Sequence, residues 1–268
     1  MNQQPNQGTA LITGASAGIG ATYAQRLAAR GYNLIMVARD AARLQRLAAQ
    51  LQAAHGVQIE VMPADLTRRD ELLAVEQRLR TDAAITLLVN NAGMAVQGQL
   101  IDADIDRYEA MIQLNVISVT RLAAAAAASF GARGNGTIVN IASVLALAPE
   151  LFNGTYSGTK AYVLNLSQSM QQELAPLGVR VQVVLPGATR TDIWDRSGGS
   201  VDALPAEMLM EVDDLVDAAL SGLDQGEVVT IPSLPARADW EALEAARHAL
   251  GPNLSRNHPA ERYLNHVA

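Results

Sequence analysis

The stretch TALITGASAGIG, residues 9–20, joins a short apolar run to a glycine-rich turn and the start of an amphipathic segment. Its glycines follow the spacing G-x-x-x-G-x-G, at Gly14, Gly18 and Gly20. A strand, a glycine turn and a helix in this order present free backbone N–H groups and a positive helix end to a phosphate. We therefore predict a dinucleotide site in which Gly14 makes the turn, Gly18 allows close backbone approach and Gly20 allows close helix packing. A flexible turn without a ligand is the alternative.

Short apolar runs of this kind recur along the chain and alternate with segments rich in Ala, Leu, Gln, Arg and Glu. Most runs are apolar on both faces, as strands buried in a parallel sheet are. This alternation predicts an α/β fold, a Rossmann-type doubly wound sheet of about seven parallel strands flanked by helices. The predicted strands are residues 9–13, 33–38, 57–62, 85–90, 136–142, 179–185 and 227–231.

The domain organisation follows from length and from one break in the pattern. An α/β chain of 268 residues can form a single unit, so we predict one domain over residues 1–268. Within it we expect a cofactor-binding and catalytic core at 8–190, a substrate-loop region at 191–225 and a C-terminal tail at 238–268. The loop region is rich in Gly, Ser and Asp and follows a predicted strand, where α/β enzymes carry their substrate loops.

Composition narrows the class of protein. The formal net charge is −7 and the pI about 5.1, without a basic stripe, which argues against nucleic acid and anionic membranes as partners. The chain has no cysteine, and its four histidines show no metal-ligand spacing, so we expect no metal site. The N-terminus is polar and no apolar run reaches the roughly 20 residues of a membrane span without a charge or a break. A cytoplasmic protein is expected.

The end of the second predicted strand reads VARD, residues 37–40. NAD enzymes commonly place an acid near this point, whereas here Ala38 takes that position and Arg39 follows. An arginine can bind a 2′-phosphate through two hydrogen bonds, so we predict NADP and consider NAD less likely. Arg39 as a solvated loop residue is the alternative, and Asp40 is expected to start the next helix.

Two further turns are expected near the adenosine. Asp65 follows the third predicted strand and can accept from the adenine amino group, while Thr67 and Asp70 resemble a capping box that leaves Asp65 free. The motif NNAG, residues 90–93, ends the fourth strand, and we expect Asn90 and Gly93 beside the ribose. The alternatives are a helix cap for Asp65 and a simple polar turn for NNAG.

The stretch YSGTK places Tyr156 and Lys160 four residues apart in a helix-like segment, so both side chains share one face. A free tyrosine has a pKa of about 10. Proton transfer near neutral pH calls for a decrease of roughly 2 to 3 units, which two positive charges, the lysine ammonium and an oxidised nicotinamide, can supply. The alternative is a surface tyrosine that packs on a lysine stem.

Two polar residues are candidates to assist this pair. Ser143 ends the fifth predicted strand and can bond and orient a substrate oxygen, or it can be an ordinary strand-end cap. Asn115 lies in an apolar helical stretch, where asparagine is unfavourable. It can also be a buried asparagine that the backbone satisfies.

TGASAGIG, NNAG, Asn115 in QLNVIS, Ser143 in NIASV, YSGTK and PGATRT occur in this order between residues 9 and 191. In this combination the chain resembles the short-chain dehydrogenase/reductase family, with Ala17 where a second serine is frequent. The resemblance implies hydride transfer between NADP(H) and a small to medium carbonyl or secondary alcohol, with Tyr156 as acid/base. It implies that Lys160 also holds the nicotinamide ribose and that Asn115 kinks its helix and holds a water that links Lys160 to solvent.

The resemblance also implies the cofactor contacts. The glycine loop, the NNAG turn, the catalytic pair and the turn PGATRT contribute them, and Thr191 is expected at the carboxamide. The predicted contacts are Gly14, Ser16, Gly18, Ile19, Gly20, Arg39, Asp65, Leu66, Asn91, Ala92, Gly93, Tyr156, Lys160, Pro186, Gly187, Thr189 and Thr191.

The substrate and the assembly are less sharply defined. Apolar residues near the predicted site suggest an uncharged ketone, aldehyde or secondary alcohol, although several can equally be core residues. They are Met94, Val96, Leu145, Leu147, Phe152 and the region of Trp194. Helices near 107–131 and 156–176 resemble those that pair subunits in this family, so we expect a homo-oligomer, a dimer or a homotetramer. A non-catalytic NADP-binding regulator and an epimerase or dehydratase are the alternative functions.

Overall fold

The computed structural model describes residues 7–98, 100–198, 200 and 204–264. The chain divides into two compact units, one up to Pro232 and one from Ser233 onward. The second unit contains the predicted tail, with helix α9 at Arg237–Ala249 and none of its described helical residues buried. Parts of the predicted substrate-loop region, residues 199 and 201–203, and the end of the tail lie outside the described residues.

Seven strands form one parallel sheet in the first unit, in the order β3-β2-β1-β4-β5-β6-β7. The predicted doubly wound sheet is therefore confirmed, and each predicted strand overlaps an observed one. Differences are limited to ends: β3 begins at Ile59, and β7 is only two residues long because it pairs with just the last two residues of β6. The strands are β1 Thr9–Thr13, β2 Asn33–Ala38, β3 Ile59–Pro63, β4 Ile85–Asn90, β5 Gly136–Ile141, β6 Val179–Val184 and β7 Val229–Thr230.

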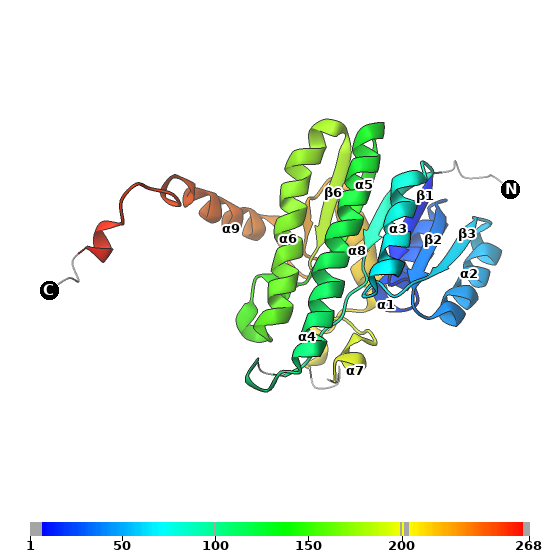
Figure 1. The fold of residues 1–268 in the computed structure, drawn as a ribbon, viewed down its shortest axis with the longest axis horizontal. Helices are drawn as coiled ribbons and strands as arrows, with labels where there is room; N and C mark the ends of the chain where they lie inside the picture. Colours follow the sequence, from blue (N-terminus) through cyan, green and yellow to red (C-terminus); the bar gives the residue numbers. More distant parts are fainter. Residues whose placement is uncertain (1–6, 99, 199, 201–203, 265–268) are drawn as a thin grey trace. The chain divides into compact units, whose positions relative to one another are not determined.

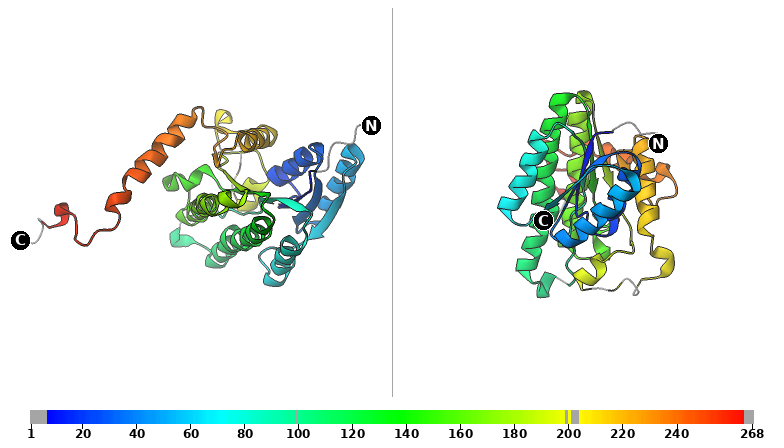
Figure 2. Two further views of the ribbon diagram at one scale, coloured as in Figure 1. Left: turned by 90° about the horizontal axis from the view of Figure 1, so that it is seen from above. Right: turned by 90° about the vertical axis from the view of Figure 1, so that its right-hand side faces the viewer.

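Helices cover both faces of the sheet. Successive strand residues point to opposite faces, and both sets are apolar here, so each face needs a helical layer to bury it. Ala10 and Ile12 of β1 pack with residues of α1, α2 and α8, whereas Leu11 packs with residues of α3, α5 and α6. Figure 1 and Figure 2 show the sheet between these two helical layers. The helices of this unit are α1 Gly18–Ala29, α2 Ala41–His55, α3 Arg69–Thr81, α4 Ile105–Ile112, α5 Val119–Arg133, α6 Gly154–Leu174, α7 Ile193–Ser197 and α8 Val212–Asp224.

Local signals set several helix ends. Asp40 caps α2 by accepting from the Arg43 N–H at 2.9 Å, as the sequence predicts. Gly56 ends the same helix at φ +69°, a left-handed conformation that glycine adopts without a steric cost.

Helix α4, a π-helical segment at Gln113–Ser118 and α5 run on as one helix, Ile105–Arg133. By length and composition alone this helix is long and apolar enough to cross a membrane. The core helices of soluble proteins pass the same test, and α5 buries Leu122, Ala126 and Phe130 in the core that it shares with α3 and α6. Small alanine side chains on this face permit that close packing.

The strand order reverses between β1 and β4, which are adjacent although three helices and two strands separate them in the chain. In open α/β sheets the crevice for ligands lies outside the carboxyl ends of the strands at this point. The glycine loop follows β1 and the NNAG motif follows β4, so the fold brings both motifs to this crevice.

Candidate active site

The glycine loop after β1 is shaped by two steric demands. Gly14 has φ +68°, which a residue with a Cβ rarely adopts. A Cβ placed on Gly20 would lie 2.3 Å from the Gly14 carbonyl oxygen, so the first turn of α1 packs against the loop only with glycine there. Both glycines therefore hold the roles that the sequence assigns them.

Thr13, which the sequence analysis did not single out, joins the glycine loop to the NNAG turn. Its hydroxyl oxygen accepts from the N–H groups of Asn91 and Ala92, both at 3.0 Å. The Asn91 amide in return donates to the carbonyls of Thr13 at 2.9 Å and Gly14 at 3.3 Å. The sequence shows a threonine at the end of the first predicted strand, but it does not show that this residue contacts Asn91 and Ala92.

The start of α1 has no side-chain cap, because its N-cap residue is Ala17. The first N–H groups of this helix are therefore available to an anionic group. Ser16 is half-buried next to them, and Ile19 packs against the core. From the far side, the methyl group of Thr191 lies 3.3 Å from where a Gly18 Cβ would be. The loop after β6 thus lies directly against the glycine loop.

An exposed cation lies at the end of β2, where the adenosine is expected. Arg39 follows Ala38 at the end of β2, is exposed, and has no ion pair with any residue that the structure describes. The Leu66 side chain is buried in the core.

The predicted capping box at Thr67 and Asp70 is wrong. Helix α3 begins at Arg69, and Thr67 instead donates to Asp65 Oδ1 from its N–H at 3.0 Å and its hydroxyl at 2.7 Å. Asp65 therefore organises its own turn, because a short aspartate side chain reaches the backbone two residues on.

The NNAG turn divides between the sheet and the site. Asn90 does not face the crevice as expected. Its buried amide lies on the face of the sheet that α5 covers, where it donates to Asn140 Oδ1 at 3.0 Å. Gly93 does face it: a Cβ there would lie 3.3 Å from Asn115 Oδ1 and 3.5 Å from Lys160 Nζ. The last residue of the motif thus meets the catalytic candidates.

Tyr156, Lys160 and Ser143 converge at the carboxyl ends of β4 and β5. Tyr156 and Lys160 come from the first two turns of α6, and the Lys160 Nζ lies 5.7 Å from the centroid of the Tyr156 ring. Lys160 donates to the Ile141 carbonyl at 3.1 Å. The Ser143 hydroxyl hydrogen-bonds to the Tyr156 side chain. All three side chains are buried, so the surface-tyrosine alternative does not hold.

Burial dominates the electrostatics of this pair. Loss of hydration raises the pKa of the Tyr156 phenol to about 12, and the hydrogen bond from Ser143 offsets only part of that rise. Burial also lowers the pKa of the Lys160 ammonium to about 8. The predicted decrease needed the positive charge of an oxidised nicotinamide as well as Lys160, whereas the chain by itself raises the pKa of Tyr156 through burial. The decrease therefore stays a prediction for the enzyme with its oxidised cofactor. Near neutral pH the structure holds a neutral phenol beside a lysine that is still largely protonated.

Asn115 lies in the π-helical segment Gln113–Ser118, where the regular ladder of helix hydrogen bonds is interrupted. Its Oδ1 accepts from the Met94 N–H and its Nδ2 donates to the Met94 carbonyl, both at 2.9 Å. The Nδ2 also donates to Thr159 Oγ1 on α6 at 3.1 Å. Asn115 therefore ties the chain after NNAG to the helix that carries Tyr156.

The turn PGATRT follows β6 and closes the site from the other side. The Pro186 carbonyl accepts from the Val144 N–H at 3.0 Å, next to Ser143. Thr189 donates to the Gly187 carbonyl at 3.0 Å, and its own carbonyl accepts from the Trp194 indole at 2.8 Å. The turn is thereby held between the strand end with Ser143 and helix α7.

An apolar cluster surrounds the Tyr156 ring. Phe152 meets this ring edge to face, with centroids 5.4 Å apart. Of the predicted pocket residues, Met94, Val96, Leu145 and Phe152 belong to this cluster, whereas Leu147 is exposed. Tyr108 and Met111 of α4 complete it.

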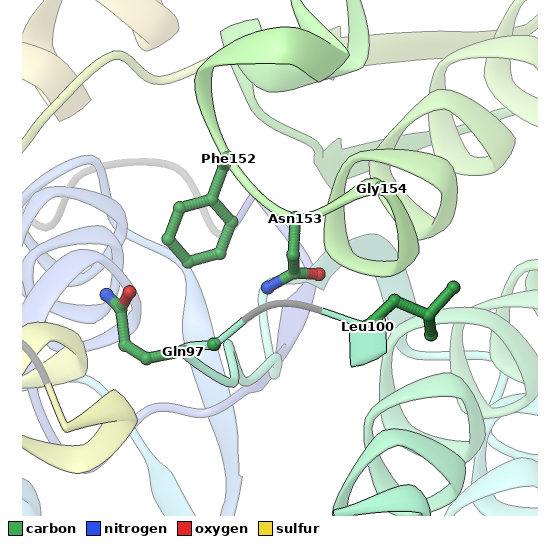
Figure 3. Close-up of a pocket in the computed structure, with 6 residues that line it drawn as sticks. Gln97, Leu100, Phe152, Asn153 and Gly154 are labelled. Atoms are coloured by element: carbon green, nitrogen blue, oxygen red, sulfur yellow. The ribbon is translucent and has the colours of Figure 1, made fainter. Parts of the chain in front are cut away.

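A pocket of about 460 Å³ opens beside this cluster (Figure 3). Among its lining residues the sequence analysis had named only Phe152. No motif marks the others, which the fold brings together from the loop after β4 and the start of α6. The lining residues are Gln97, Gly98, Leu100, Phe152, Asn153 and Gly154.

Comparisons with known proteins agree with this geometry. Residues 8–200 match the short chain dehydrogenase family. A short-chain dehydrogenase from Sphingobium yanoikuyae, solved in complex with NADPH, is 53% identical and has a TM-score of 0.93, covering 96% of this chain and 99% of its own. The bulky-bulky ketone specific alcohol dehydrogenase from Comamonas testosteroni is 48% identical with a TM-score of 0.90, covering 97% and 100%.

A curated relative, an uncharacterized oxidoreductase from Staphylococcus saprophyticus, is 31% identical over 229 residues, which is 85% of this chain and 96% of that protein. The protein belongs to the short-chain dehydrogenase/reductase family. It is accordingly an enzyme, an NAD(P)-dependent oxidoreductase.

The residues at the crevice fit the dinucleotide that the family implies. Only glycine at positions 14 and 20 lets the loop pack against the NNAG turn and the first turn of α1, and the N–H groups at the start of α1 have no side-chain cap, so they are available to a pyrophosphate. At the other end Gly93 lies against Lys160, where an added Cβ would be 3.5 Å from Nζ. Gly14, Gly18 and the α1 N-terminus would hold the pyrophosphate, and Lys160 would hold the nicotinamide ribose.

Proposed function

We propose that this protein reduces uncharged, bulky ketones to secondary alcohols, and oxidises such alcohols in reverse, with NADP(H) as the preferred cofactor. The observation that carries the proposal is the buried contact set of Tyr156, Ser143, Lys160 and Asn115 at one end of the dinucleotide crevice. It combines a proton donor, an orienting hydroxyl and a cation, all on buried side chains.

The geometry supports Tyr156 as the acid in reduction. When bound, the cofactor supplies the hydride in reduction and, in its oxidised form, a positive charge beside the phenol. The Tyr156 hydroxyl gives its proton to the carbonyl oxygen as negative charge develops there, while the Ser143 hydroxyl holds the same oxygen in place. A pKa raised to about 12 keeps the phenol protonated, which suits the reductive direction.

Lys160 and Asn115 support this transfer from behind the tyrosine. The Lys160 ammonium stabilises the phenolate that remains after proton donation. Asn115 holds the Met94 backbone, and with it the turn that ends in Gly93, against Lys160. We infer that a water at Asn115 connects Lys160 to solvent and returns the proton.

Arg39 supports the preference for NADP. It is an exposed cation at the end of β2, without an ion pair among the described residues, where a 2′-phosphate of the ribose would lie. The 53% identical Sphingobium enzyme was solved with NADPH. Asp65, Leu66 and Thr191 remain proposed contacts to the adenine and the carboxamide.

The pocket supports an uncharged, bulky substrate. Its wall beside Tyr156 is apolar, and its polar lining groups are the carboxamides of Gln97 and Asn153 rather than charged groups. The 48% identical Comamonas enzyme is named for bulky-bulky ketones.

The decisive experiment mixes the protein with NADPH and a panel of aliphatic and aromatic ketones and follows NADPH oxidation. We expect turnover, and lower KM values for ketones with two large substituents than for acetone. Tight NADPH binding without turnover on any ketone or alcohol would favour the NADP-binding regulator instead.

We also propose a cytoplasmic homo-oligomer, a dimer or a tetramer. Ile112 and Ile117 on the helix Ile105–Arg133 and Tyr162 on α6 are exposed, and they lie on the two helices predicted to pair subunits. The need for reduced dinucleotide supports the cytoplasmic location. Light scattering tests the assembly, and a mass of 28.4 kDa, that of a single chain, would contradict it.

A further inference from the structure

The loop after β4, residues 94–98, is held by four side chains or peptide groups from other elements. Each of these hydrogen bonds is made to the loop backbone, and the buried Val96 side chain adds apolar packing. The ties are Asn115 to both peptide groups of Met94, Asn153 to the Val96 carbonyl, the Ser197 carbonyl to the Gln97 N–H at 3.3 Å, and the Tyr108 hydroxyl to the Gly98 carbonyl at 3.2 Å.

The carboxamide of Asn153, like that of Asn115, serves two elements at once, and it is the one that caps the helix carrying Tyr156. Its Oδ1 accepts from the Tyr156 N–H at 2.8 Å, which caps the first turn of α6. Its Nδ2 donates to the Val96 carbonyl. The side chain is half-buried and lines the pocket opposite Gln97, as Figure 3 shows. One planar group therefore links the catalytic tyrosine to the pocket wall.

A helix cap alone does not require this residue. An N-cap needs only an oxygen acceptor, and aspartate and serine provide one as well as asparagine does. Within this chain Asp40 caps α2 and Asp104 caps α4 through carboxylates that accept from Arg43 and Arg107. A carboxamide carries its donor and its acceptor on two separate atoms, so Nδ2 can reach the Val96 carbonyl while Oδ1 caps the helix. A carboxylate lacks the donor, and a serine hydroxyl has both functions on one shorter atom.

We propose that Asn153 is a positioning residue that fixes the distance between the pocket wall at 94–98 and the first turn of α6. The acceptor, Oδ1, positions the first turn of α6 with Tyr156, and the donor, Nδ2, positions the pocket wall against which the ketone packs. The inference rests on the proposed ketone reductase function. If it holds, loss of the Nδ2 donor should change KM, and loss of the Oδ1 acceptor should change kcat.

Three variants separate the two halves. Asn153→Ser and Asn153→Asp keep the cap acceptor but lack the amide donor, one without and one with a charge. Both are expected to raise the KM for a bulky aromatic ketone about tenfold, the loss of roughly one hydrogen bond, and to leave kcat within about twofold. Asn153→Ala removes both halves, and kcat is expected to fall about tenfold as well. The NADPH Kd is expected to stay unchanged in all three.

Hydrogen exchange provides a readout that does not depend on turnover. The Gln97 N–H should exchange faster in Asn153→Ser and Asn153→Asp, while the Tyr156 N–H stays protected; in Asn153→Ala both should exchange faster. A wild-type protein that reduces no ketone overturns the proposed function. An active wild-type protein whose Ser and Asp variants match it in KM and in Gln97 exchange overturns the role of Asn153. Equal losses of kcat in all three variants would reduce Asn153 to a helix cap and also overturn it.

Discussion

The two ends of the crevice are built in different ways. At the cofactor end, the loop Thr13–Gly20 and the turn Asn91–Gly93 are fixed by glycines that admit no Cβ and by hydrogen bonds between backbone and buried side chains. At the substrate end, apolar side chains of connecting segments remain exposed, with Leu100 at 69% and Leu151 at 70%. The cofactor end has a fixed shape that its ligand must match, whereas the substrate end has exposed apolar surface that a substrate can cover. Single substitutions should therefore change binding strongly at the cofactor end and only weakly at the pocket.

The largest effect should come from the residue where the two ends meet. Tyr156→Phe removes only the hydroxyl that we propose as the proton donor. We expect kcat to fall about 1,000-fold, because general acid catalysis contributes roughly 100- to 10,000-fold. NADPH affinity should stay within about twofold, since the ring and the fold remain. Steady-state ketone reduction and NADPH fluorescence titration measure the two quantities. A kcat near that of the wild-type protein would remove Tyr156 from the chemistry.

The steric shape of the cofactor end is tested by Gly20→Ala. The added Cβ would lie 2.3 Å from the Gly14 carbonyl oxygen, so the loop or α1 must move. Overpacking of this kind costs roughly 1 to 3 kcal/mol, and we expect NADPH affinity to fall about 10- to 100-fold.

Gly158→Ala is the matched control for that substitution. Gly158 lies in α6 with nothing within 4 Å of an added Cβ, so alanine should stabilise the helix by about 1 kcal/mol. NADPH affinity should not change. If both glycine variants bound NADPH equally well, the steric account of the cofactor end would be wrong.

The charge at the adenosine side gives a smaller and more selective effect. Arg39→Ala should raise the KM for NADPH about 10- to 100-fold, the loss of a charge-assisted hydrogen bond worth roughly 1.5 to 3 kcal/mol. The KM for NADH should change by less than about twofold, because NADH carries no 2′-phosphate. Arg46→Ala, an exposed arginine of α2, serves as control and should alter neither value. An equal loss for both cofactors would argue against a 2′-phosphate contact.

The smallest effect concerns stability rather than turnover. The folded-state pKa of Lys160, about 8, lies below its unfolded value of about 10.4, so the unfolded chain binds more protons between these values. The stability contribution of Lys160 should therefore rise with pH over that window. Relative to Lys160→Met, the wild-type protein should gain about 2 kcal/mol in its free energy of unfolding between pH 8 and 10.

Urea unfolding of both proteins at pH 8 and pH 10 measures this difference. Tyr156 does not interfere in this range, because its raised pKa of about 12 makes stability fall only above its unfolded value of about 10. A difference that stays constant, or that shrinks as the pH rises, would show that Lys160 remains charged in the folded protein.

The sequence alone determined the sheet and the residues that surround its switch point. Buried parallel strands are apolar on both faces, so seven runs could be read directly, and TGASAGIG, NNAG and YSGTK are local motifs whose shape depends on near neighbours. The tie from Thr13 to Asn91 and the place of Asn90 under the sheet were not visible, because each depends on a partner about 50 to 80 positions away.

Only the tertiary structure decided the electrostatics and the pocket. Lys160 together with an oxidised nicotinamide predicts a more acidic Tyr156 in the cofactor-bound enzyme. In the chain itself burial raises the pKa of this phenol, and burial is a property of the packed protein. The pocket is lined by Gln97 and Leu100, which follow β4, and by Phe152 and Asn153, which follow β5. No sequence motif connects these two segments. Local motifs in a sequence indicate contacts between residues that are close along the chain. The hydration of a side chain and the walls of a cavity depend on all the elements that pack around them.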